Sequence, residues 1–259
     1  MTIENEMTRW LALEGAANAR VVVPGVLLRS DNLQSLTDQD IALLVEREAV
    51  EVVLDLRTDV EVALEGPGPL TRDPRVRIEH RSLYPQTNGN TDLDAATVKP
   101  WRESAPGRFS EEEESPVVRA YLSYLVARPD SIVASIRAIA RAGGAALVHC
   151  AAGKDRTGVV VALALDAGGV GRDMIVADYL ATAERIDAIL GRLLGSPTYR
   201  AELEGQDPQR HAPAPGTMER VLDLVDEHFG GSAAWLAAHG LGEADLDRLQ
   251  RRLAESPRR

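Results

Sequence analysis

The sequence predicts an α/β protein with a central, largely parallel sheet flanked by helices. Short runs rich in Val, Leu and Ile have the length of buried strands, and they alternate with longer segments whose apolar residues recur at helical spacing. Of the 259 residues, 44% are hydrophobic, enough to bury a full core. We therefore expect one domain over residues 1–259, with helices on both faces of the sheet.

Four apolar runs are the strand candidates, and each is bounded by turn or helix signals. They are residues 21–28, 50–56, 76–83 and 145–150. A helix is predicted between the first two, over residues 37–48, because Thr37 can cap a segment with apolar residues at helical spacing.

The middle of the chain is a long polar segment. Residues 85–116 are polar, are interrupted by Pro100 and Pro106, and include four consecutive glutamates at 111–114. A loop of this length is either functional or disordered, and the glutamates alone indicate only a solvated charge cluster. Further helices are predicted over the segments 117–125, 131–142, 159–165, 172–182, 186–194, 218–228 and 241–253.

The most informative segment is residues 149–158, His-Cys-Ala-Ala-Gly-Lys-Asp-Arg-Thr-Gly, which contains the only cysteine, Cys150. It lies between a strand candidate and a helix candidate. Free N–H groups and the dipole at a helix N-terminus favour an anion. Cys150 begins the loop and Arg156 closes it, and a thiol facing a planar guanidinium suits a tetrahedral phosphate. The loop predicts hydrolysis of phosphate monoesters through a cysteinyl-phosphate.

The same surroundings predict a low pKa for the Cys150 thiol. A helix N-terminus and nearby cations lower a cysteine pKa from ~8.5 to roughly 3.5–7.5. Lys154, Arg156 and His149 are close in sequence, so we expect a thiolate at neutral pH. Thr157 is expected to donate its hydroxyl to the sulfur when the thiolate leaves, a role compatible with helix capping.

The remaining loop residues are predicted to bind substrate. Ala151, Ala152 and Gly153 offer backbone N–H groups, and Lys154 offers a cation to the substrate phosphate or to a second anionic group. The alternative for Lys154 is a solvated surface lysine. His149 more often orients such a loop through hydrogen bonds than contacts substrate.

The loop at 149–158 and several other segments resemble the motifs of a known family. His-Cys-x-x-Gly-Lys-x-Arg-Thr-Gly resembles the signature loop of the cysteine-dependent protein tyrosine phosphatase superfamily, and the Lys-Asp-Arg version resembles its bacterial triple-specificity branch. The segments 28–33, 36–37, 53–57, 61–62 and 175–180 match that branch in order and spacing, and the likeness runs from about Gly15 to about Ala254. One departure is the N-terminal Asn-Phe-Arg-Asp of the branch, which is half kept here as Asn-Ala-Arg-Val at 18–21. The resemblance implies a protein tyrosine phosphatase-like fold with a C-terminal helical lid at about 183–228, and no cofactor.

Phosphoryl transfer also needs an acid for the leaving oxygen. Many tyrosine phosphatases place it in a Trp-Pro-Asp loop, which this chain lacks. Asp155, inside the loop, is the favoured candidate. Asp55, at the end of a strand candidate, is the second, and its alternative role is a salt bridge with Arg57 or a hydrogen bond to a loop.

Competing site classes fit less well. A nucleotide-binding phosphate loop needs Ser or Thr where Asp155 stands and Gly where Val148 stands. A sulfurtransferase would not need the Arg-Thr-Gly ending, and an arsenate reductase needs further cysteines. The five histidines show no metal-ligand spacing, so no metal site is predicted.

Net charge and length of apolar runs limit the partners. A net charge of −11 argues against nucleic acid and anionic membranes, and no apolar run approaches a membrane span. The polar start of the chain lacks a signal peptide's basic region, and a lone cysteine fits a reducing compartment. We expect a cytoplasmic location, with signal-independent secretion left open.

The expected partners are phosphorylated proteins and, as a further option, phosphoinositides, with phosphate as product or inhibitor. A phosphoinositide or inositol phosphate phosphatase is the first alternative, because Lys154 and Asp155 make the loop strongly charged. An inactive phosphate-binding module is the second, and the intact Cys150, Arg156 and Asp155 argue against it.

Overall fold

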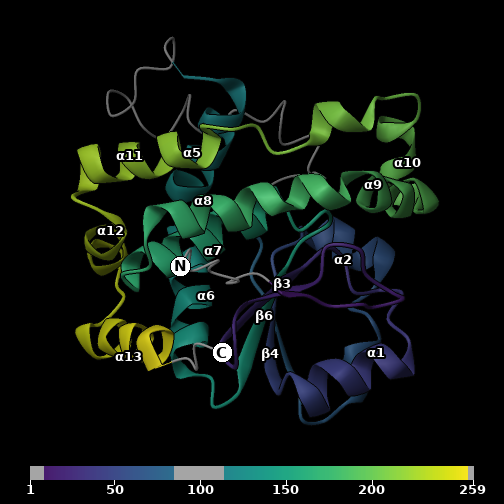
Figure 1. Ribbon diagram of the computed structural model, residues 1–259, viewed down its shortest axis with the longest axis horizontal. Helices are drawn as coiled ribbons and strands as arrows, with labels where there is room; N and C mark the ends of the chain where they lie inside the picture. The colour runs from purple at the N-terminus through teal and green to yellow at the C-terminus, as the bar shows by residue number, and fades with distance from the viewer. Residues whose placement is uncertain (1–8, 85–113, 256–259) are drawn as a thin grey trace, which may run out of the picture.

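One mixed sheet organises the computed structural model, which describes residues 9–84 and 114–255. Its strand order is β1-β2-β3-β6-β4-β5 (Figure 1). The strands are β1 (Arg9–Trp10), β2 (Arg20–Val23), β3 (Leu27–Ser30), β4 (Val50–Asp55), β5 (Arg77–His80) and β6 (Ala145–His149). The strands β3, β6, β4 and β5 are parallel neighbours, and β1 and β2 add an antiparallel edge. The predicted largely parallel sheet is confirmed.

The register of β6 positions the loop that follows it. His149, the last residue of β6, pairs with Ser30 at the end of β3 and with Asp55 at the end of β4. The carboxyl ends of three parallel strands therefore meet where residues 150–154 begin. Open α/β sheets bind their ligands at such an edge.

The segment 21–28, predicted as one strand, is a hairpin of β2 and β3. Pro24 and Gly25 make the turn, Gly25 has φ +70°, and the Val26 N–H donates to the Val23 carbonyl at 3.0 Å. Proline presets the first turn position and glycine accepts a positive φ, so this dipeptide breaks an otherwise continuous apolar run.

The predicted helices are present. They are α1 (Asp38–Ala42), continued by the π-helical turn η1 (Leu43–Arg47), α5 (Pro116–Ala127), α6 (Pro129–Arg141), α7 (Asp155–Ala167), α8 (Arg172–Ala181), α9 (Ile186–Gly195), α11 (Thr217–Phe229) and α13 (Glu243–Glu255). Thr37 caps α1 as expected, in a reciprocal pair with Asp40. Of the predicted loop at 85–116, residues 85–113 lie outside the described residues, and Pro116 already belongs to α5.

Three helices of seven residues each were not predicted: α2 (Asp59–Glu65), α10 (Pro197–Leu203) and α12 (Ser232–Ala238). Two turns are too short to show a helical period in sequence. Short 3-10 turns complete the described elements: η2 (Pro69–Arg72), η3 (Thr182–Arg185) and η4 (Pro208–His211).

Helices cover both faces of the sheet, as predicted (Figure 1). Alternate residues of β6 divide between two cores: Ala146 and Val148 pack with α5 to α8 and α11 to α13, whereas Ala145 and Leu147 pack with η1 and the N-terminal segment. Within the described residues, no helix is long and apolar enough to cross a membrane.

Candidate active site

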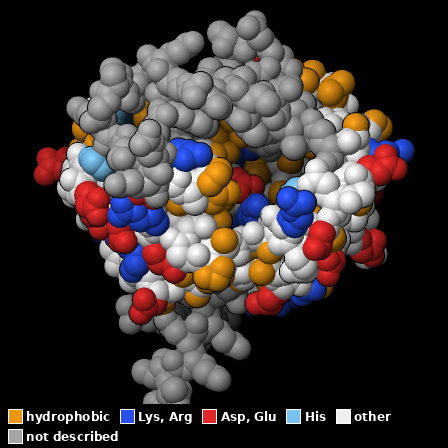
Figure 2. Space-filling view, turned by 90° about the horizontal axis from the view of Figure 1, so that it is seen from above, with side chains coloured by type: hydrophobic (Ala, Val, Ile, Leu, Met, Phe, Trp, Pro, Cys, Tyr) orange, Lys and Arg blue, Asp and Glu red, His pale blue; other side chains and the backbone are white. Residues whose placement is uncertain are grey.

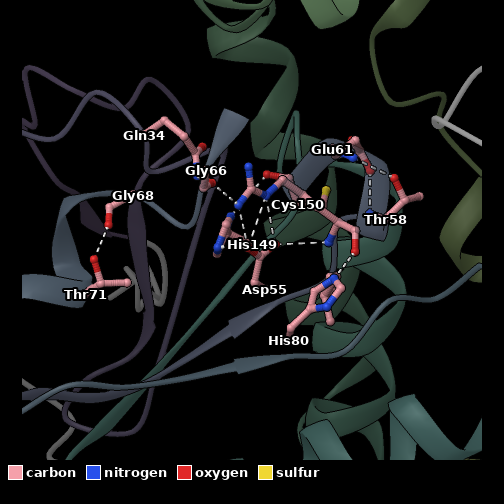
Figure 3. A network of polar contacts seen from close by, with 12 residues as sticks. Gln34, Asp55, Thr58, Glu61, Gly66, Gly68, Thr71, His80, His149 and Cys150 are labelled. Carbon is pink, nitrogen blue, oxygen red and sulfur yellow. Dashed lines mark hydrogen bonds and ion pairs between the residues drawn. The ribbon is translucent and has the colours of Figure 1, made fainter. Parts of the chain in front are cut away.

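The loop between β6 and α7 holds Cys150 at the floor of the site. Cys150 is 2% exposed. It follows His149, whose Nε2 lies 3.6 Å from Asp55 Oδ1 at the end of β4 (Figure 3). On the face shown in Figure 2, the surface is hollowed, and basic and acidic side chains lie in the hollow beside hydrophobic ones.

The loop carbonyls are held outward by neighbouring segments. The Ala151 carbonyl accepts from the Asn32 N–H at 2.9 Å. Asn18 Nδ2 donates to the carbonyls of Ala152 at 2.9 Å and Gly153 at 3.1 Å. Because the C=O and the following N–H of a peptide plane point in opposite directions, the N–H groups of residues 152–154 face the loop interior. This is a concave nest of donors suited to an anion.

Gly153 is required where the loop meets β3. Its φ is +67°, and a Cβ at this position would lie 2.3 Å from the Ser30 carbonyl oxygen. Both the backbone conformation and the close approach exclude a side chain.

A buried ionic network supports the same loop. Asp178 of α8 accepts from Arg20 Nε at 2.8 Å and from Arg29 Nη1 at 2.5 Å, and Arg29 also donates to the Gly153 carbonyl at 2.6 Å. Burial opposes ionisation of Asp178, but the two guanidinium groups hold its pKa below the usual range. Burial lowers the pKa of Arg20 to about 10. The retained Asn and Arg of the half-kept N-terminal motif, Asn18 and Arg20, both belong to this support.

Arg156 is fully buried and paired with a carboxylate that sequence reasoning did not identify. Glu61 of α2 accepts from Arg156 Nη1 at 2.7 Å and from Nη2 at 3.0 Å, and Tyr199 donates to Glu61 at 2.8 Å. Although burial opposes it, Arg156 keeps the pKa of Glu61 below its usual range. Glu61 also completes a capping box with Thr58 (Figure 3), and this Thr-x-x-Glu pattern could have located α2 in the sequence.

The predicted low pKa of Cys150 is wrong for this structure. Burial raises the pKa of the thiol, and the Asp155 carboxylate raises it further. The Thr157 hydroxyl and the N–H groups of Thr157 and Gly153 lower it, but they do not offset the loss of solvent. Desolvation disfavours a thiolate even where hydrogen-bond donors face it.

The two candidate acids have different environments. Asp55 is 1% exposed and forms an ion pair with Arg57, at 2.6 Å from Nη2 and 2.9 Å from Nε. Burial raises its pKa, but His149 and Arg57 together hold it far below the usual range. Asp55 thus makes the salt bridge that the sequence offered as its alternative role. Asp155 begins α7, its side chain is 34% exposed, and its Oδ1 accepts from the Tyr121 hydroxyl at 2.5 Å.

A segment at residues 186–212, which we call the covering segment, packs over the loop. Ala151 and Ala152 share an apolar cluster with side chains of α9 and α10. Lys154 Nζ donates to the His211 carbonyl at 2.6 Å and lies 3.4 Å from Asp155 Oδ1, so Lys154 is engaged with its own chain. The helix α11 packs against α5, α7 and α8, and its buried apolar side chains belong to the main core and not to this cluster, so the covering segment ends at residue 212.

Among residues 9–84 and 114–255, no group of three or more His, Cys, Asp or Glu side chains is placed to hold a metal ion.

A family model and the sequence relatives agree on one family. A family model described as the tyrosine phosphatase family matches residues 12–255. The triple specificity protein phosphatase PtpB of Mycobacterium tuberculosis is 29% identical over 93% of this chain and 95% of its own length. A tyrosine-protein phosphatase of Nostoc commune is 29% identical over 93% of this chain and 78% of its own length. A crystal structure of a P. aeruginosa TpbA variant in complex with pTyr has a TM-score of 0.38 and 15% identity, covering 85% of this chain and 98% of that chain. With its family model spanning almost the whole sequence, the chain belongs to the tyrosine phosphatase family.

Proposed function

We propose that this chain hydrolyses phosphotyrosine in proteins through a phosphorylated Cys150. The observation that carries the proposal is the cradle itself: N–H groups of residues 152–154 turned inward around the sulfur, with the buried Arg156 following in the first turn of α7. Such a site stabilises the equatorial oxygens of a phosphoryl group during transfer.

The proposed reaction has two steps. Once the covering segment has opened, the Cys150 thiol gives its proton to solvent. Its thiolate then attacks phosphorus in line with the ester oxygen, the P–O bond breaks, and Asp155 gives its proton to the departing phenoxide. A water molecule then attacks phosphorus, gives a proton to Asp155, and releases phosphate as the S–P bond breaks. The Thr157 hydroxyl, which faces the sulfur, stabilises the departing thiolate.

The choice of Asp155 as the acid is supported by the ion pairing of the other candidate, Asp55. Since Asp55 is paired with Arg57 and its pKa lies far below the usual range, it holds no proton to donate at neutral pH. We assign Asp55 the role of orienting Arg57 and His149 beneath the loop. Asp155 is partly exposed at the helix N-terminus, where a leaving group can reach it.

Substrate access requires movement of the covering segment. The segment packs on Ala151, next to the buried Cys150, and Tyr199 within it bonds the carboxylate that pairs with Arg156. Burial is the main cause of the raised thiol pKa. We infer that residues 186–212 act as a lid on a single phosphatase domain. Opening would readmit solvent and allow the donors around Cys150 to lower its pKa.

The contacts of Lys154 bear on the range of substrates. The charged loop motivated a phosphoinositide alternative, but Lys154 donates to the His211 carbonyl rather than standing free for a second phosphate. We therefore favour phosphotyrosine proteins, with phosphoserine, phosphothreonine and phosphoinositides as secondary substrates. The single cysteine, typical of a reducing compartment, supports a cytoplasmic site of action.

The test combines a nucleophile variant with a substrate panel. Cys150→Ser should abolish turnover of a phosphotyrosine peptide while still binding it, and an acid quench of the wild type should trap one phosphoryl group on the Cys150 peptide. Turnover by Cys150→Ser would overturn the assignment. If a phosphotyrosine peptide is inert while a phosphoinositide vesicle is hydrolysed, the alternative substrate class is correct.

A further inference from the structure

Four buried tyrosines near Asp155 form two hydroxyl pairs. The Tyr121 and Tyr179 oxygens are 3.0 Å apart, and the Tyr84 and Tyr124 oxygens are 2.9 Å apart. Only the first pair reaches Asp155 within the described residues, through the 2.5 Å bond from Tyr121 to Oδ1. The proposed reaction leaves all four tyrosines unassigned.

The direction of the first pair follows from counting hydrogens. A phenol has one hydrogen, and an ionised carboxylate only accepts. Burial, with the nearby Asp155 charge, raises the pKa of Tyr121 well above its usual value, so Tyr121 stays protonated. Since its hydrogen goes to Asp155, the hydrogen between the two tyrosines comes from Tyr179. The chain of donation runs from Tyr179 to Tyr121 to Asp155.

We propose that Tyr121 is the positioning residue of the general acid, with Tyr179 as its support. This inference rests on the proposed role of Asp155. The Tyr121 hydrogen occupies Oδ1, so when Asp155 is protonated its acidic hydrogen must reside on Oδ2. The hydroxyl also prevents free rotation of a carboxyl group that is one-third exposed. Tyr121 thus determines which oxygen presents the proton to the leaving group.

The packing makes this arrangement rigid. Tyr121 and Tyr179 are 1% and 2% exposed, and their rings meet edge to face with centroids 6.3 Å apart. Tyr121 also stacks on Tyr124. A Cβ at Gly158, the last residue of the signature loop, would lie 3.2 Å from the Tyr179 ring, so the glycine leaves room for this tyrosine beside α7.

The test uses aryl phosphates whose leaving groups differ in basicity. For Tyr121→Phe we expect kcat to be nearly unchanged with 4-nitrophenyl phosphate, which needs little protonation, and about tenfold lower with phenyl phosphate, because a misplaced acid serves only the basic leaving group. KM should stay unchanged for both. The matched control is Tyr124→Phe, which removes a buried hydroxyl that lies on the same helix and does not bond to Asp155. Its ratio of kcat for 4-nitrophenyl phosphate to kcat for phenyl phosphate should equal that of the wild type.

A double variant separates this inference from the role of Asp155 itself. If Tyr121 acts through Asp155, Tyr121→Phe combined with Asp155→Asn should be no slower than Asp155→Asn alone. Should Asp155→Asn show no leaving-group dependence, the acid assignment fails. A second outcome would overturn only the positioning role of Tyr121. In it, Asp155→Asn shows the leaving-group dependence, but Tyr121→Phe either behaves like Tyr124→Phe or slows both substrates equally. If Tyr121→Phe does not fold, Tyr179→Phe decides, with a smaller loss of the same selectivity expected and its absence counting against the role.

Discussion

The ion pair between Glu61 and Arg156 makes a strong prediction about stability. Both side chains are 0% exposed, and the carboxylate binds the guanidinium through two contacts of 2.7 and 3.0 Å. Glu61→Gln keeps the shape and one acceptor oxygen but removes the charge that neutralises Arg156. Breaking a buried pair from one side costs about 3–5 kcal/mol, a large share of the ~5–15 kcal/mol that stabilises a typical domain.

Inorganic phosphate should reverse part of this loss. A ligand that binds only the folded state at one hundred times its Kd adds about 2.7 kcal/mol. In the variant, phosphate no longer competes with Glu61 for the guanidinium, so its stabilising effect should be at least as large as in the wild type. The assay is urea unfolding followed by circular dichroism at pH 7, with and without phosphate.

Glu65→Gln is the matched control on the same helix. Its carboxylate accepts from the hydroxyls of Ser196 and Thr198 and, among the described residues, forms no ion pair with a cation. Because Gln keeps one acceptor oxygen for these hydroxyls and leaves no cation without its partner, the loss there should be about 1 kcal/mol. If Glu61→Gln loses no more than Glu65→Gln in phosphate-free buffer, the electrostatic reasoning is refuted.

Two further predictions concern the loop. Because burial raises the pKa of Cys150, the thiol is neutral at pH 7 while the covering segment is closed. Its alkylation by iodoacetamide at pH 7, followed by mass spectrometry, should therefore be slower than that of a cysteine in an unstructured peptide, and an equal rate would contradict this. Gly153→Ala should destabilise the protein by at least about 2 kcal/mol more than Gly25→Ala. Both sites have a positive φ, but only at Gly153 would the Cβ collide, 2.3 Å from a carbonyl oxygen. Equal melting temperatures of the two variants would argue against the clash.

Much of the fold could be predicted because its signals are local. The strand and the helix on either side of the loop are short apolar runs that can be recognised in the local sequence, and Thr37 marks the start of its helix as a capping residue. Where a period is absent the prediction failed: α2 spans two turns, and the hairpin at Pro24 was hidden in a continuous apolar run.

The sequence by itself determined which chemical groups stand in the loop and in what order: a thiol, three small residues, a lysine, an aspartate, and an arginine at a helix N-terminus. Those groups are adjacent along the chain, so their chemistry is readable without a fold. Only the tertiary structure decided what each group faces. The carboxylate paired with Arg156 lies 95 residues earlier, the phenol on Asp155 lies 34 residues earlier, and the segment that packs on Ala151, next to Cys150, begins at Ile186. Desolvation and ion pairing depend on every atom within a few ångströms, whatever its place in the sequence, which is why the direction of the Cys150 pKa shift was mispredicted.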